Sequence, residues 1–228
     1  MTRVAYEKGA LFLTTLEKAF GRETFDPFLK AYFDHFGFQS ITTAQFLGYL
    51  QDHLLAKNPV IAKTIPISDW IEKPGLPAGA PEVKSAKFGL VEDAALRFAA
   101  GKTSAKQLTT AAWTTQEWLH FLQSLPESLT GNQMADLDQA FGLTQRGNSE
   151  IAALWLVLAI RHQYEPANAR LESFLTTIGR RKFLMPLYGE LIKTSKGRQT
   201  AGAIFEKARS FYHPISRDSV SKLLAKPQ

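Results

Sequence analysis

Three cations stand together at the start of a predicted helix. The stretch IGRRKFLMPLY, residues 178–188, places Arg180, Arg181 and Lys182 directly after Gly179. A helix N-terminus carries roughly half a positive charge, so each exposed cation there costs about 0.3–1 kcal/mol. The charges are therefore either solvated or placed to receive an anion. In a regular helix residues 180 and 182 diverge by about 200°. They can converge on one ligand only where the backbone is irregular, which the glycine favours.

A tyrosine stands at the entrance of the first predicted helix. In VAYEKGALFL, residues 4–13, Tyr6 is followed by Glu7, an acid at the helix end where the dipole favours negative charge. Gly9 permits a close approach of another backbone. A phenol at this position is either a packed aromatic side chain or a hydrogen-bond donor to a reacting group. The pattern alone leaves both interpretations open.

The other residue types exclude several kinds of site. The five histidines are far apart in sequence and form no HExxH zinc motif. Because the chain has no cysteine, disulfides, thiolate metal sites and thiol nucleophiles are excluded. The GxSxG, Walker and GxGxxG motifs are also absent. The chain by itself contains no recognisable complete active site, and no metal site is expected in it.

Positive charge is concentrated in the last third of the chain. The formal net charge is +6 over 228 residues, and residues 161–228 hold 13 Lys/Arg against 5 Asp/Glu. Residues 1–160 hold 14 against 16. Anionic ligands are therefore expected near the C-terminal third. No interleaved aromatic–basic motif is present, so nucleic acid is not expected as a partner. No apolar run approaches the 18 or so residues of a membrane span, so no membrane is expected either.

Helical periodicity dominates the sequence and predicts an all-α protein. The apolar residues of TFDPFLKAYFDHF, residues 24–36, recur at i, i+3, i+4, i+7 and i+8. Capping boxes with Gln or Glu three residues on are predicted at Thr42 and Thr114. Ser149 is predicted to cap the apolar segment that follows it. No comparable run alternates with a period of two, so strands are not expected.

The segment PGLPAGAP, residues 74–81, interrupts the helical pattern. It has three prolines and two glycines in eight residues, so it cannot continue a helix. About three helices and the short segment ISDWIEK precede it, and about eight short helices follow. Such short helices with brief turns predict antiparallel helix pairs stacked in layers, as in an armadillo- or HEAT-like superhelix. Breaks are expected near residues 101–103, 112–115, 126–130, 143–148, 163–166, 179–181, 196–199 and 213–216.

Taken together, these stretches resemble the zinc aminopeptidase family that includes leukotriene A4 hydrolase and aminopeptidase N. VAYEKGALFL resembles the segment after that family's metal site, and WIEKPGLPAGAP resembles the strap by which the chain leaves the catalytic domain. NSEIAALWLVLAI, IGRRKFLMPLYGEL and FYHPISRDSV are similar, in this order, to the C-terminal helical domain of the leukotriene A4 hydrolase branch. The likeness covers essentially the whole chain.

The resemblance implies a C-terminal fragment of a leukotriene A4 hydrolase-like aminopeptidase. Residues 1–74 would be the C-terminal part of a thermolysin-like zinc peptidase domain, residues 75–84 a Pro/Gly-rich linker, and residues 85–228 the helical domain. The family's GxMEN loop and its HExxH…E zinc site would precede residue 1. Zinc is therefore expected in the full-length enzyme and not in this chain, which by itself would be inactive. The missing N-terminal and catalytic domains of the same chain are its implied partners.

The resemblance also implies roles for three residues. Tyr6 matches the family's catalytic tyrosine, which hydrogen-bonds the oxyanion of the tetrahedral intermediate. Arg180 and Lys182 match the Arg-x-Lys pair that holds the carboxylate end of a short peptide or, in the vertebrate enzyme, of a lipid epoxide. Arg181, between them, is expected to be solvated or structural. The lipid hydrolase has a second tyrosine where this chain has Met1, so peptide hydrolysis is expected rather than epoxide hydrolysis.

Two other readings of the sequence remain open. The chain could be a stand-alone helical scaffold that binds acidic peptides or nucleic acid on its basic third. It could instead be a purely structural or oligomerising module. The expected function is removal of N-terminal residues from short peptides that carry a free carboxylate, by the full-length enzyme. A cytoplasmic location is expected, with the true N-terminus and any signal peptide outside the chain.

Overall fold

The fold consists of helices. A computed structural model describes residues 4–82 and 84–225, and within these ranges it contains no strand. The prediction of an all-α protein is confirmed. The chain divides into two compact units, residues 1–83 and 84–228. Each unit encloses a hydrophobic core of its own.

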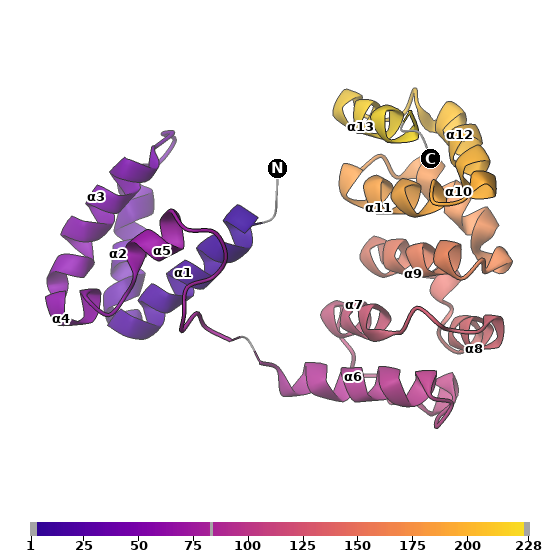
Figure 1. Cartoon of the computed structure of the whole chain (residues 1–228), viewed down its shortest axis with the longest axis horizontal. Helices are drawn as coiled ribbons and strands as arrows, with labels where there is room; N and C mark the ends of the chain where they lie inside the picture. The colour runs from indigo at the N-terminus through magenta and orange to yellow at the C-terminus, as the bar shows by residue number, and fades with distance from the viewer. Residues whose placement is uncertain (1–3, 83, 226–228) are drawn as a thin grey trace. The chain divides into compact units, whose positions relative to one another are not determined.

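The first unit is a small group of helices around an aromatic core. Its elements are α1 (Val4–Phe20), α2 (Arg22–His35), α3 (Thr43–His53), the 3-10 helix η1 (Leu55–Lys57), α4 (Pro59–Ala62) and α5 (Ile67–Ile71). Helix α1 packs against both α2 and α5 (Figure 1). The rings of Phe12 and Trp70 stack with centroids 5.6 Å apart, and Leu16 is fully buried beside them. Burial of this apolar face fixes the direction of α1.

Residues 72–82, together with 84 and 85, form turns and extended backbone between the two units. The second unit follows with eight α-helices in the part of the chain that the structure describes. Its elements are α6 (Ala86–Ala99), η2 (Ala105–Gln107), α7 (Thr115–Ser124), α8 (Gly131–Phe141), η3 (Leu143–Gln145), α9 (Ser149–Arg161), η4 (Glu165–Ala167), α10 (Asn168–Thr177), α11 (Arg181–Leu191), α12 (Ser195–Ala208) and α13 (Pro214–Leu224). Helix α7 packs against α9, α9 packs against α11, and α11 packs against α13. Helices α10 and α12 pack together on the other side of the stack (Figure 1). This is the predicted superhelix of stacked helices.

Two local predictions of helix ends are confirmed and two are wrong. Thr42 and Thr114 both form the predicted capping boxes. Ser149 is not a cap, because the side chain of Asn148 accepts the hydrogen bonds from the first turn of α9, and Ser149 is the first residue of the helix. The break expected at residues 196–199 is also wrong, because α12 begins at Ser195, with Thr194 as its cap.

Buried hydrogen bonds fix α11, the helix that carries the cationic triplet. Tyr188 is fully buried on α11, and its hydroxyl lies 3.1 Å from the hydroxyl of Tyr212. Tyr212 donates in turn to the carbonyl of Leu175 at the end of α10. Burial is the main cause that raises the pKa of the Tyr188 phenol, so this ring stays neutral and acts as a hydrogen-bonding part of the core.

Candidate functional site

Tyr6 lies in the first turn of α1 and is open to solvent. Its side chain is 71% exposed. Lys8 anchors this part of α1, because its ammonium donates to the carbonyls of Asp69, within α5, and of Lys73, just beyond it. The phenol of Tyr6 makes no hydrogen bond to a described residue. It is therefore free to donate one to a ligand, and its ring is not part of the packed core.

The cationic triplet begins just before α11. Arg180 is the N-cap residue, with extended backbone angles of φ −76° and ψ 117°, and Arg181 and Lys182 are the first two helical residues. The backbone at Arg180 is thus irregular, which is the condition for residues 180 and 182 to converge. The guanidinium carbon of Arg180 lies 5.8 Å from the ring centre of Phe183, and the ammonium of Lys182 lies 5.6 Å from it. Both charges therefore lie near one buried ring, an arrangement that stabilises a cation by about 0.5–1 kcal/mol at an exposed site.

Gly179 allows the chain to turn from α10 into the triplet. A Cβ atom on this residue would lie 3.3 Å from Cε1 of Phe211, a distance tighter than nearly all real contacts of Cβ atoms. The loop before α13 therefore comes close to the backbone just before Arg180. A side chain on this residue would require the exposed ring of Phe211 to shift slightly, and the φ angle of Gly179 is not in the left-handed region.

The three cations have different partners. Lys182 contacts both carboxylate oxygens of Glu150, each at 2.7 Å. Arg181 donates from Nε to the hydroxyl of Ser219 on α13, at 2.8 Å. No hydrogen bond or ion pair joins the side chain of Arg180 to any residue in the ranges 4–82 and 84–225. All three residues are exposed, but Arg180 is the member of the triplet whose side chain has neither an anionic nor a neutral hydrogen-bond partner among the described residues.

Glu150 offsets the cost of placing Lys182 at a helix start. It lies in the first turn of α9, where the helix dipole favours a carboxylate, and its side chain is 32% exposed. Sequence reasoning missed this residue, because 32 positions separate it from Lys182 and no spacing rule connects them. The contact exists because α9 and α11 pack side by side.

A second charged cluster lies at the opposite end of the same helix pair. Arg161, the last residue of α9, contacts Glu190 near the end of α11 at 3.2 Å, and Lys193 contacts the same carboxylate at 2.9 Å. Burial raises the pKa of Glu190, but the hydrogen bonds from the two cations outweigh burial and hold it below its usual value. One ion pair joins the N-terminal ends of α9 and α11, and another joins their C-terminal ends. The two helices therefore run in the same direction.

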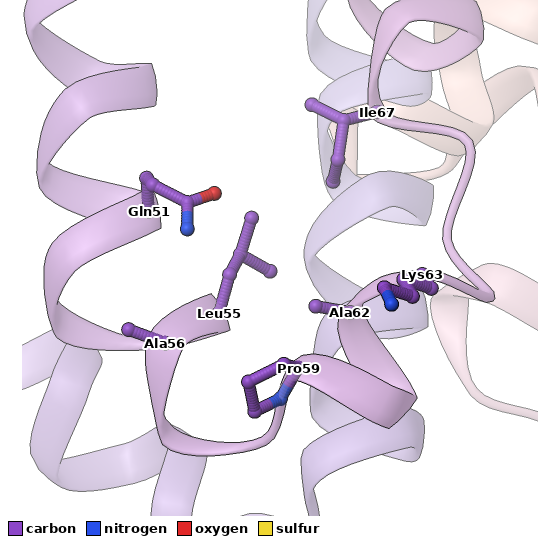
Figure 2. Close-up of a pocket in the computed structure, with 7 residues that line it drawn as sticks. All are labelled: Gln51, Leu55, Ala56, Pro59, Ala62, Lys63 and Ile67. Carbon is purple, nitrogen blue, oxygen red and sulfur yellow. The ribbon is translucent and has the colours of Figure 1, made fainter.

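The structure contains a small pocket away from these residues. It has a volume of about 300 Å³ and lies between the end of α3 and the start of α5. Figure 2 shows Leu55 and Gln51 on one side of this space and Ile67 on the other. Neither Tyr6 nor the triplet lines it, and the sequence analysis did not predict it.

Two further properties concern the described residues alone. Within residues 4–82 and 84–225, no three His, Asp or Glu side chains gather closely enough to hold a metal ion. In the same ranges no helix is both long and apolar enough to cross a bilayer.

Comparison with known proteins identifies the family. Residues 113–224 match the family described as "Leukotriene A4 hydrolase, C-terminal", and residues 1–70 match the "Peptidase family M1 domain". The chain is a member of the leukotriene A4 hydrolase family of M1 peptidases. Tyr6 falls in the M1 match, and the cationic triplet falls in the leukotriene A4 hydrolase match.

Relatives of this family cover nearly the whole chain. Leucine aminopeptidase 2 of Yarrowia lipolytica is 33% identical over 96% of the chain, and leucine aminopeptidase 2 of Neurospora crassa is 31% identical over 96%. The chain spans only 35% and 33% of the lengths of these two relatives. The solved structure of native yeast LTA4 hydrolase is similar with a TM-score of 0.80 and 25% identity, over 99% of this chain and 40% of that one. The same enzyme in complex with bestatin gives a TM-score of 0.81.

Proposed function

We propose that this chain is the C-terminal portion of a zinc metallo-aminopeptidase that removes N-terminal residues from short peptides. The observation that carries the proposal is the exposed guanidinium of Arg180, which has no anionic partner among the described residues and lies on a surface of the leukotriene A4 hydrolase-type helical domain. The chain's contribution is a binding site for the carboxylate end of the peptide.

The domain organisation is part of the proposal. Residues 1–74 are the C-terminal part of the peptidase domain, residues 75–84 are a linker, and residues 85–228 are the helical domain. The match of residues 1–70 to M1 peptidases and the separate core of the first unit support the first assignment. The match of residues 113–224 supports the last.

Arg180 has the chemistry needed to bind a peptide carboxylate. A guanidinium presents two parallel N–H donors that match the two oxygens of a carboxylate, and such charge-assisted pairs are roughly twice as strong as neutral hydrogen bonds. An anion at this position also lies at the N-terminus of α11, where the helix dipole favours it. Lys182 lies over the same ring and adds positive potential, although Glu150 offsets most of its charge.

Tyr6 has the chemistry needed to stabilise an oxyanion. Its exposed hydroxyl can donate a hydrogen bond to the oxygen that becomes negative when water attacks a peptide carbonyl, and one such donor contributes about 3 kcal/mol to the transition state. Zinc, when bound in the complete protein, supplies an activated water for this attack. The described residues of this chain offer no ligand set for it. Peptide binding and oxyanion stabilisation are therefore the roles proposed for this chain.

The proposal is tested with Arg180→Ala in the full-length enzyme. Tripeptides with a free carboxylate and the same tripeptides with an amidated C-terminus are compared by kcat/KM. Loss of a charge-assisted contact of about 1.5–3 kcal/mol predicts a fall of about 10- to 100-fold for the free acids. The amides are expected to change little. Arg217→Ala is the matched control, because it removes an exposed arginine of α13. An equal effect of Arg180→Ala on both classes of peptide would contradict carboxylate binding.

A further inference from the structure

The three cations of the triplet differ in their partners: Lys182 has the carboxylate of Glu150, Arg181 has the neutral hydroxyl of Ser219, and the side chain of Arg180 has neither kind of partner among the described residues. Both oxygens of the carboxylate contact the ammonium at 2.7 Å, so Lys182 already has an anion. Arg180, two residues earlier and near the same Phe183 ring, has none among the described residues. Arg180 is therefore available to bind a substrate carboxylate, whereas Lys182 is already paired with Glu150.

The packing of α9 against α11 holds this ion pair in place. Glu150 and Lys182 join the two helices at their starts, and Arg161 and Glu190 join them at their ends. The backbone N–H of Glu150 is itself held by the side chain of Asn148, at 3.0 Å. Glu150 cannot move far from the triplet while these contacts persist. Its carboxylate is thus held on Lys182, beside the proposed carboxylate site.

We propose that Glu150 is a specificity-determining residue that limits this site to one substrate carboxylate. By pairing with Lys182 it withdraws that cation from a second substrate anion, so peptides that end in Asp or Glu gain nothing from Lys182 and bind less well than peptides that end in Asn or Gln. The inference rests on the proposed function, because it assigns the substrate C-terminus to Arg180. Glu150 acts on the substrate by charge and is not a catalytic residue.

Glu150→Gln in the full-length enzyme tests the inference. The substrates are two tripeptides that differ only in a C-terminal Gln or Glu, each with a free carboxylate. In the variant Lys182 becomes available, and KM for the Glu-ending peptide falls about three- to fivefold relative to the Gln-ending one, the size expected for an exposed ion pair. The kcat for both peptides stays nearly unchanged. The wild-type preference shrinks as salt is added, because exposed charges are screened.

Two further variants make the result specific. Glu172→Gln removes a more exposed ion pair with Lys207, which joins α10 to α12, and leaves the Glu/Gln ratio unchanged. Lys182→Gln removes the cation and leaves Glu150 unpaired, so discrimination against the Glu-ending peptide increases. These opposite shifts distinguish the charge of Glu150 from a general loss of stability.

The two proposals fail in different ways. If Glu150→Gln leaves the Glu/Gln ratio of KM as in the wild type, while Arg180→Ala still lowers activity on free acids selectively, the role of Glu150 is wrong and the carboxylate site stands. If the wild type hydrolyses free acids and amides equally well, the carboxylate site itself is wrong. Equal shifts in Glu150→Gln and Glu172→Gln would also overturn the role of Glu150.

Discussion

The turn between α11 and α12 yields a sharp prediction about stability. Gly197 is the third residue of α12, and its N–H donates to the hydroxyl of Thr194, the helix cap, at 3.0 Å. A Cβ atom here would collide with the carbonyl oxygen of Leu191 and would lie 2.8 Å from the Thr194 hydroxyl. The substitution Gly197→Ala must therefore displace the backbone at the end of α11 or break the cap.

The expected change in the free energy of unfolding combines two destabilising effects and one stabilising effect. Overpacking costs about 1–3 kcal/mol. Loss of the cap costs about 1 kcal/mol. The better helix propensity of alanine returns up to about 1 kcal/mol. We expect Gly197→Ala to lower the free energy of unfolding by about 2 kcal/mol, which lowers Tm by about 4–8 °C for a chain of this size.

A matched control lies in the same helix. Among the described residues, and apart from the helix's own backbone, no atom lies within 4 Å of a Cβ atom on Gly202. Gly202→Ala therefore gains the propensity and raises the free energy of unfolding by up to about 1 kcal/mol. Urea unfolding of the 228-residue chain, followed by far-UV circular dichroism, measures both variants. If Gly197→Ala is neutral or stabilising like Gly202→Ala, the close approach to Leu191 is wrong.

Two further predictions concern catalysis and pH. Tyr6→Phe in the full-length enzyme is expected to lower kcat by about 10²–10³ with unchanged zinc content, because an oxyanion donor is lost; loss of metal measured by atomic absorption would instead make Tyr6 a structural residue. His162 is half-buried, its Nε2 has no hydrogen-bond partner in the part of the chain that the structure describes, and burial, reinforced by the charge of Arg161, holds its pKa below the usual value. The folded state therefore disfavours the imidazolium. The contribution of neutral His162 to the free energy of unfolding is fully present above about pH 6.5 and is lost as the pH falls through the folded pKa. Urea titrations from pH 7.5 to 5 should show a smaller acid loss in His162→Gln than in wild type, and equal losses would contradict the assignment.

Local sequence signals predicted the helices well. The capping boxes at Thr42 and Thr114 could be predicted because all of their hydrogen bonds lie within three residues. The same signature at Thr130, with Gln133 three residues on, also forms a box, although the sequence analysis did not use it. About eight helices were expected after the Pro/Gly-rich segment, and residues 84–225 contain eight α-helices, α6 to α13.

The errors have physical causes. Gly197 was interpreted as part of a break, but it lies inside α12, at a position where the carbonyl oxygen of Leu191 leaves no room for a side chain. Asn148, and not Ser149, caps α9. Both residue types are common helix caps, so residue type alone cannot predict which of two adjacent candidates is the cap.

The long-range partners of the predicted site residues could not be predicted from the sequence. The resemblance supplied Arg180 and Lys182 as candidates, but their different environments follow from tertiary packing. Glu150 reaches Lys182 from a helix that begins about thirty residues earlier, and Ser219 reaches Arg181 from a later one. Periodicity predicts which face of a helix is apolar, and it says nothing of which charged residue of another helix lies beside it.

The most direct test of the account is a crystal structure of the full-length enzyme with a non-hydrolysable tripeptide that has a free carboxylate. The account predicts that both carboxylate oxygens lie within about 2.7–3.2 Å of the guanidinium nitrogens of Arg180. It also predicts that the ammonium of Lys182 stays on Glu150. A peptide whose carboxylate is held by other residues, with the guanidinium of Arg180 still facing solvent, would contradict it.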